Sequence, residues 1–241
     1  FVHAEIFYQR NRRRGGERLG KGNMEQRIET KNIGRKFNPD GSVRFFPGNT
    51  VISKLHEDSE IYPLISRISR SFREVQGSKY AFLPEHSFHM TVIQGVCDED
   101  RKAELWSRHL SLETPLEETD VFFEQQFSRA KPLGQVKMVF DRVDTERDII
   151  IVRFGPAAET DRKRMEEYRS ELSELLGIRF PDHDSYGFHV SVAYKLWKLE
   201  PEEETAVEQV RDQWNETCSV SRPSFLLPQP ELTFFENMFE F

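Results

Sequence analysis

The chain has 241 residues, of which 37% are hydrophobic and 31% are charged, and its net charge is −7. This length allows one large domain or two small lobes with a real core, and the composition is that of a soluble globular protein. No apolar run approaches the ~18 residues that a membrane span needs. An acidic body disfavours duplex DNA, whose affinity comes from neutralised phosphates. We therefore expect no membrane and no duplex-DNA partner, while a nucleotide or short RNA in a locally basic cleft stays open.

The charge is unevenly spread along the chain. Residues 1–22 hold six basic and two acidic residues, a charge of +4, which leaves −11 for the remainder. They lack the apolar stretch and small-residue cleavage site of a signal peptide. A start placed upstream of Met24, a flexible arm and a nucleic-acid-binding tail are all open interpretations. We expect a solvated basic leader at 1–22, followed by a single bilobal domain over 23–241.

The two cysteines, Cys97 and Cys218, are far apart and lack CxxC spacing. A disulfide framework is therefore not predicted, and a reducing cytoplasm is the expected location. Both cysteines are expected to be plain thiols rather than catalytic groups.

The first half of the chain begins with turns and then alternates strands with helices. Pro-Asp-Gly at 39–41 and Pro-Gly-Asn at 47–49 predict turns. A short strand is predicted over 51–55 and another over 88–94, with a helix between them at 59–76. That helix has apolar residues at helical spacing and a stop at Gly77; these residues are Ile61, Leu64, Ile65, Ile68 and Phe72. Further helices are predicted over 98–110 and 116–129.

The second half repeats this order. Paired strands are predicted over 136–143 and 148–154, followed by a helix over 158–176 that ends at Gly177, and by a strand over 188–194. A helix over 201–214 begins with proline and acidic residues, as the helix dipole prefers. A last strand is predicted over 231–239.

The repeat predicts the architecture. Each half has a strand, a helix and a strand that carries a histidine, and the spacing is similar in both: 37 residues from Ile52 to His89 and 39 from Ile150 to His189. Two such units predict an α+β fold with two pseudo-symmetric lobes of antiparallel sheet, outer helices and a central cleft.

The histidine strands carry the chemistry. Because side chains alternate along a strand, His89 and Thr91 share one face, while Phe88, Met90 and Val92 share the other. In the second copy His189 and Ser191 are placed in the same way. Two imidazoles and two hydroxyls would converge if the lobes face each other. Imidazole can act as acid or base near neutral pH, and hydroxyls can hold phosphate oxygens. The set predicts phosphoester chemistry that requires no cofactor.

The duplicated His-x-Thr/Ser pattern, each copy flanked by apolar residues, resembles the 2H phosphoesterase superfamily, which includes LigT-like RNA cyclic phosphodiesterases, plant cyclic phosphodiesterases and nucleotide-binding domains of anchoring proteins. The resemblance covers about residues 45–240 and is stronger to a bacterial branch of unknown function. It implies metal-independent cleavage of a cyclic phosphate on a nucleotide, an RNA end or ADP-ribose. By the same analogy His89 would protonate the leaving oxygen, His189 would activate water, and Thr91 and Ser191 would hold the phosphate.

Other residues are candidates for lining the cleft. Tyr186 lies in the loop before the second motif, and Tyr194 would line the cleft if a bulge follows Ser191; for Tyr194 core packing is favoured. The remaining polar candidates are Asn49, Thr50, Lys54 and Arg153. Three phenylalanines, Phe45, Phe46 and Phe88, offer base stacking, although core burial is the default. A metal site from His86, Asp182, His183 and Asp184 fits no ligand template, so no metal is predicted.

The functional prediction is a monomeric, cytoplasmic, metal-independent hydrolase of cyclic phosphates, whose partner is a small nucleotide or an RNA end. A module that binds a nucleotide or RNA end in the same cleft without turnover is the alternative. An activity like that of an RNA-end ligase or decapping enzyme is a third interpretation. The presence of both histidines and both hydroxyls favours the enzyme.

Overall fold

The computed structural model describes residues 28–241, so the predicted basic leader at 1–22 lies outside the described part. Among the described residues, no helix combines the length and the apolar character needed to cross a membrane. The core is rich in aromatic side chains, and Phe37, Phe72 and Phe123 are fully buried in it. The high aromatic content of the chain is thus used for packing.

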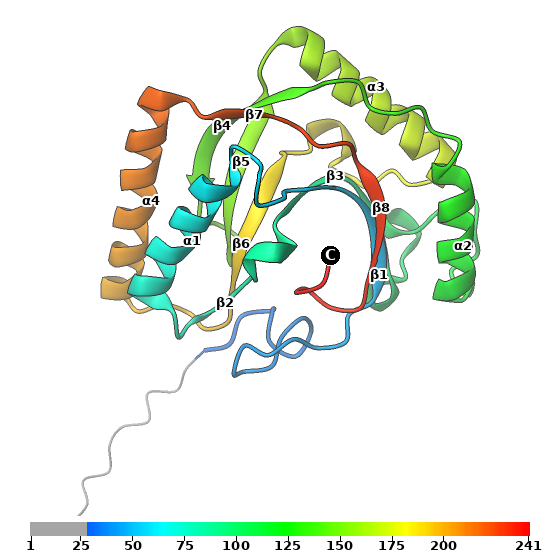
Figure 1. Cartoon of the computed structure of the whole chain (residues 1–241). Helices are drawn as coiled ribbons and strands as arrows, with labels where there is room; N and C mark the ends of the chain where they lie inside the picture. Colours follow the sequence, from blue (N-terminus) through cyan, green and yellow to red (C-terminus); the bar gives the residue numbers. More distant parts are fainter. Residues whose placement is uncertain (1–27) are drawn as a thin grey trace, which may run out of the picture.

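The centre of the fold is an eight-stranded sheet (Figure 1). Its strands are β1 (Gly48–Lys54), β2 (Tyr80–Phe82), β3 (His89–Cys97), β4 (Lys137–Asp144), β5 (Ile149–Pro156), β6 (His189–Lys195), β7 (Ser224–Leu226) and β8 (Glu231–Phe235). The strand order is β7-β4-β5-β6-β3-β1-β8, and β2 pairs with β6 outside this path. The pairings are antiparallel. The predicted α+β class with an antiparallel sheet is confirmed.

Four α-helices of the described chain cover the sheet: α1 (Tyr62–Gln76), α2 (Leu116–Phe127), α3 (Glu159–Leu176) and α4 (Pro201–Ser221). In Figure 1, α1 lies beside α4 at one side of the sheet, and α2 meets α3 at the other. The apolar residues predicted for the inner face of the first helix are all buried. Since Pro63 has no N–H to donate and occupies the first turn, α1 begins later than the predicted residue 59.

The two halves of the chain meet in one continuous sheet, because β3 pairs with β6. The predicted strand–helix–strand repeat is present as β1, α1 and β3, and again as β5, α3 and β6. Equivalent backbone bonds recur: the Leu55 N–H donates to the Phe88 carbonyl, and the Phe154 N–H donates to the Phe188 carbonyl, both at 2.9 Å. The relation of the halves by a pseudo-two-fold axis stays a prediction.

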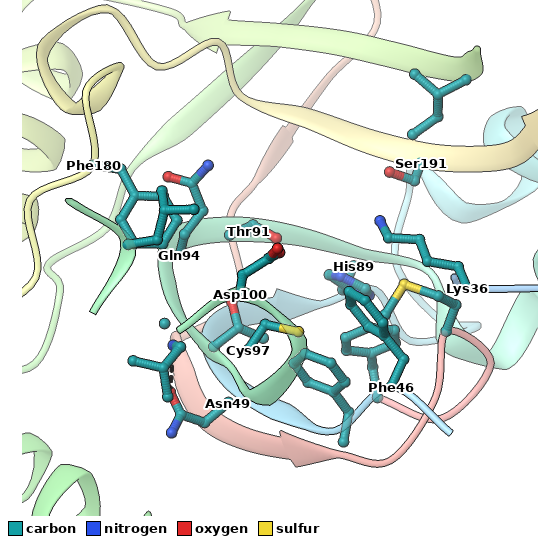
Figure 2. A pocket seen from close by; sticks show the side chains of 18 of the residues that line it. Lys36, Phe46, Asn49, His89, Thr91, Gln94, Cys97, Asp100, Phe180 and Ser191 are labelled. Carbon is teal, nitrogen blue, oxygen red and sulfur yellow. Dashed lines mark hydrogen bonds between the residues drawn. The ribbon is translucent and has the colours of Figure 1, made fainter. Parts of the chain in front are cut away.

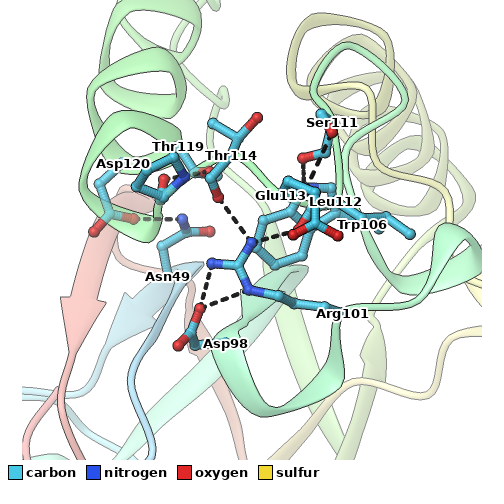
Figure 3. A network of polar contacts seen from close by, with 11 residues as sticks. Asn49, Asp98, Arg101, Trp106, Ser111, Leu112, Glu113, Thr114, Thr119 and Asp120 are labelled. Carbon is cyan, nitrogen blue, oxygen red and sulfur yellow. Dashed lines mark hydrogen bonds and ion pairs between the residues drawn. The ribbon is translucent and has the colours of Figure 1, made fainter.

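Residues 98–110 do not form the predicted α-helix. Two short 3₁₀ turns stand in its place, η2 (Asp98–Asp100) and η3 (Ala103–Leu105). In the polar network of Figure 3, the Arg101 guanidinium donates to the carbonyls of Leu112 at 2.6 Å and Thr114 at 2.8 Å. These bonds to a distant part of the same loop stabilise a compact turn, and a straight helix over 98–110 would break them.

The same arginine makes local contacts that fix the loop. Its Nε and one terminal nitrogen donate to the Asp98 carboxylate at 2.9 and 2.5 Å, and its guanidinium lies 4.4 Å from the centre of the Trp106 ring. The Trp106 indole in turn donates to the Ser111 carbonyl at 3.1 Å (Figure 3). The acidic residues that suggested a helix start are therefore partners of an arginine.

Other boundaries differ by a few residues. Strands β2 and β7 are three residues each, too short to show a period of two in the sequence. Helix α4 continues to Ser221, and β8 ends at Phe235 instead of residue 239. Residues 236–241 leave the sheet and bring Phe241 over the face where the histidines lie.

Candidate active site

The two histidine strands cross at one residue pair. Met90 of β3 lies opposite Val190 of β6, and both side chains are fully buried. Side chains on either side of such a bridge point to the opposite face of the sheet. The bridge therefore places both histidines and both hydroxyl residues on one face; these are His89, Thr91, His189 and Ser191.

A pocket of about 380 Å³ lies over this face, and all four of these side chains line it (Figure 2). Directly opposed residues of an antiparallel pair have Cβ atoms ~4.5–5.5 Å apart. By the register at Met90 and Val190, His89 lies on the Ser191 side of the crossing and Thr91 on the His189 side. Each imidazole thus has the hydroxyl of the other motif as its neighbour across the strands.

Both imidazoles are held in one tautomer by the backbone. Nδ1 of His89 lies 2.7 Å from the Ser87 carbonyl, and Nδ1 of His189 lies 2.8 Å from the Gly187 carbonyl. Because a carbonyl oxygen can only accept, each Nδ1 must carry a hydrogen. The Nε2 atoms then remain free to accept a proton from a ligand or, when protonated, to donate one.

Burial lowers the pKa of both imidazoles below the usual 6.5. The pKa of His89 falls to about 4, because desolvation outweighs the hydrogen bond to Ser87, and the nearby His189 and Lys54 add to the lowering. The pKa of His189 is also lowered, mainly by desolvation, with the charge of Arg153 contributing. Both rings are therefore neutral near pH 7 in the free protein, and an anion bound beside them would favour uptake of a proton.

A β-bulge follows each motif. Along β3, Thr91 pairs with Ile52 and Ile93 with Val51, so Val92 is an extra residue. Along β6, Ser191 pairs with Ile151 and Ala193 with Ile150, which makes Val192 the extra residue. A bulge reverses the alternation of side chains beyond it. Gln94 and Tyr194 therefore line the pocket, although simple alternation assigns both to the opposite face.

The carbonyls of the two bulged residues are bonded in different ways. The Val192 carbonyl accepts from the Leu83 N–H at 2.9 Å, just beyond strand β2. The Val92 carbonyl accepts from the guanidinium of Arg169, a residue of α3 with 4% exposure. Arg169 also donates to the His183 carbonyl at 2.8 Å, in the loop that leads to the second motif. This buried cation links the bulge of the first motif to the approach of the second.

Tyr186 connects this arginine to the pocket. Its ring lies 4.7 Å below the Arg169 guanidinium, and its hydroxyl is hydrogen-bonded to the Thr91 side chain. Burial raises the pKa of Tyr186 to about 12, so the phenol stays protonated. The residue lines the pocket, where its hydroxyl can orient that of Thr91.

Asn49 and Thr50 also line the pocket, but their polar atoms bind the protein itself. The Asn49 amide donates to Asp120 at 2.7 Å and accepts from the Val96 N–H at 3.1 Å (Figure 3). The Thr50 hydroxyl donates to a carbonyl of β3 at 3.3 Å. A Cβ on Gly95 would lie 2.2 Å from the Asn49 side-chain oxygen, so glycine is needed there. These residues build the pocket wall.

Lys54 and Arg153 lie outside the pocket lining. In strand register they stand beside His89 and His189, respectively. The Lys54 ammonium donates to the backbone oxygen of Phe241 at 2.7 Å, and Arg153 donates to the buried Asp144 at 2.7 Å. Both cations are therefore already engaged, which the sequence could not show because the partners are remote in the chain.

Some pocket residues carry no sequence signal. Phe241 stacks on His89 with ring centres 4.3 Å apart, and Lys36 extends into the pocket from the turn-rich segment (Figure 2). Among the stacking candidates, Phe46 lines the pocket, whereas Phe88 is buried in the core and Phe45 is 69% exposed. Contacts between distant segments decide these placements, and no periodicity reveals them.

The remaining polar candidates are not gathered at the histidine pair. His183 is buried and lines a second cavity, together with Arg169. Within residues 28–241, no group of three or more His, Cys, Asp and Glu side chains is arranged to hold a metal ion. Cys97 lines the main pocket, and burial raises the pKa of its thiol to about 11, which fits the plain thiol predicted.

Solved structures of other proteins are similar to this chain. A crystal structure of a conserved protein of unknown function, ATU0111 from Agrobacterium tumefaciens str. C58, is similar with a TM-score of 0.80 and 27% identity, over 89% of this chain and 91% of that one. TT0787 of Thermus thermophilus matches at a TM-score of 0.39 and 14% identity, over 77% and 84%. The first match supports the fold described above.

Comparison with curated proteins finds no significant match. A family model does match residues 36–148, and its description is 2H-phosphodiest, a domain of unknown function (DUF1868). His89 and Thr91 lie inside the matched range, and His189 and Ser191 lie beyond it. The resemblance to 2H phosphoesterases is thereby confirmed: residues 36–148 of this chain belong to the 2H-phosphodiest family, whose name suggests a phosphodiesterase-type hydrolase.

Proposed function

We propose that this protein hydrolyses a cyclic phosphodiester on a small nucleotide or an RNA end, with His89 and His189 as the acid–base pair. The observation that carries the proposal is that both imidazoles line one pocket with Nδ1 bound to a carbonyl and Nε2 free. The 2H-phosphodiest match supports a phosphoesterase. A phosphodiester between two such nitrogens would have a base on one side and an acid on the other.

The reaction needs one proton removed and one supplied. One neutral Nε2 takes a proton from water as the water oxygen forms a bond to phosphorus. The ring P–O bond breaks, and the protonated Nε2 of the other histidine gives its proton to the departing oxygen, leaving a phosphomonoester. The hydroxyls of Thr91 and Ser191 donate to the non-bridging oxygens, where negative charge develops.

The lowered pKa values suggest which histidine has which role. The resemblance implies His89 as the acid, but burial beneath Phe241 strongly favours the neutral form of His89. We therefore assign the base to His89 and the acid to His189. A substrate with a p-nitrophenolate leaving group needs no acid. It should restore turnover to His189→Ala and leave His89→Ala inactive; the opposite pattern reverses the assignment.

The function is tested with a substrate panel in the presence of EDTA. The panel contains 2′,3′-cyclic nucleotides, RNA with a cyclic end and ADP-ribose cyclic phosphate. Each histidine contributes ~10²–10⁴-fold, so His89→Ala and His189→Ala should each lose at least 10²-fold in kcat. The exposed His56 provides the control, and His56→Ala should retain activity. Binding without turnover in the wild type supports the alternative of a binding module.

A further inference from the structure

The pocket contains one fixed positive charge among the described residues that line it. That charge is Lys36, because the Lys54 and Arg153 cations lie outside the lining. The Lys36 ammonium lies 4.5 Å from the centre of the Tyr194 ring and 5.5 Å from that of Phe46, and 3.5 Å from the Tyr194 hydroxyl. In Figure 2 its amino group points toward the part of the pocket where His89 and Ser191 lie.

Lys36 has no acidic partner within the part of the chain that the structure describes. The acid nearest in the pocket wall, Asp100, is bound by the neighbouring Arg35 instead. Asp182, the other carboxylate that lines the pocket, is exposed. A cation that rests on aromatic rings keeps its charge available for a ligand, because a ring quadrupole does not neutralise it.

The backbone that carries Lys36 is fixed in position. The Lys36 N–H donates to the Asn32 carbonyl at 3.1 Å, and its carbonyl accepts from the Arg44 N–H at 2.9 Å. The next residue, Phe37, is fully buried with its ring centre 5.3 Å from that of Tyr194. The ammonium is therefore placed at the pocket before a ligand arrives, which reduces the entropy lost on binding.

We propose that Lys36 is the anion-binding residue of this pocket and pairs with a phosphoryl group of the substrate. The inference rests on the proposed function, since it names a further residue of the same site. A phosphodiester is a monoanion, and both neutral imidazoles and the hydroxyls lack a fixed charge to balance it. Charge-assisted hydrogen bonds from an ammonium supply this balance in a partly water-excluded site. The group held is either the reacting phosphate or a second phosphate of the same substrate.

The test compares Lys36→Met with Lys36→Arg and with Lys31→Met, an exposed lysine of the same segment that does not line the pocket. Two readouts are used: kcat/KM on a 2′,3′-cyclic nucleotide with and without a 5′-phosphate, and the dissociation constant of inorganic phosphate by calorimetry. We expect Lys36→Met to weaken phosphate binding and kcat/KM by about 10- to 100-fold. Lys36→Arg should recover most of the loss, and Lys31→Met should match the wild type.

The two substrates identify the group that is held. A loss on both substrates assigns Lys36 to the reacting phosphate, and a loss confined to the 5′-phosphorylated substrate assigns it to the second phosphate. Unchanged kcat/KM on both substrates, together with unchanged phosphate affinity, overturns the proposal. If the wild type turns over no substrate, the proposed function fails, while the affinity for phosphate still decides whether Lys36 binds anions.

Discussion

Met90 and Val190 are the residue pair through which the two histidine strands meet. Their side chains are buried on one face of the sheet, so the residues on either side of each point to the other. This crossing brings together two motifs that are 100 residues apart in the chain. The geometry of the site thus depends on an apolar pair that takes no part in the chemistry.

The pH dependence of kcat/KM follows from the lowered pKa values of the free protein. The base is lost as the pH falls through the pKa of His89, about 4, and the acid is lost as the pH rises through that of His189, which lies below 6.5. We expect a bell-shaped profile with its maximum below pH 6.5 and more than about a tenfold drop by pH 8. The profile of kcat should lie at higher pH, because a bound anion stabilises the imidazolium. A kcat/KM maximum above pH 7 contradicts the assignment.

Removing the hydroxyl of Thr91 or Ser191 should reduce catalysis without unfolding the protein. Thr91→Val and Ser191→Ala each delete one donor to the phosphate, and we expect kcat to fall on the order of 10- to 100-fold. Steady-state kinetics and the melting temperature measure the two effects. Thr205→Val is the control, since that hydroxyl bonds to a carbonyl of its own helix α4. Full activity in both site variants argues that phosphate is held elsewhere.

Arg169 should affect activity beyond its effect on stability. Arg169→Met leaves the Val92 and His183 carbonyls without their donor, and we expect the free energy of unfolding to fall by about 2–4 kcal/mol. Because the two motifs are then less well aligned, kcat should fall in conditions where the variant is fully folded. Leu172→Ala, on the same helix and also buried, should lose a similar ~2–5 kcal/mol yet keep its kcat. Equal kcat in the two variants would falsify the positioning role.

Phe241 should control the protonation of His89. Its ring covers the imidazole, so Phe241→Ala admits water and should raise the pKa of His89 from about 4 toward 6.5. Titration of the imidazole by NMR measures the shift, and the acidic limb of kcat/KM should move in the same direction. Phe234→Ala, which removes an exposed ring from β8, is the matched control. An unchanged titration of His89 in Phe241→Ala means that other residues bury the ring.

The sequence by itself determined the two motifs, the strands that carry them and the class of chemistry that they suggest. A histidine and a hydroxyl two residues apart on a strand share a face whatever surrounds them, because the alternation is a local property of the backbone. The apolar spacing of α1 and α3 was equally local, and these helices form where that spacing predicts them.

Tertiary structure decided which other residues reach the site. The bulges at Val92 and Val192 place Tyr194 in the pocket, and they depend on pairing with strands that lie far away in the chain. Lys54 and Arg153 are engaged by remote partners, while Lys36 enters the pocket from an irregular segment. Such placements arise from long-range hydrogen bonds and ring contacts, which leave no periodic trace in the sequence.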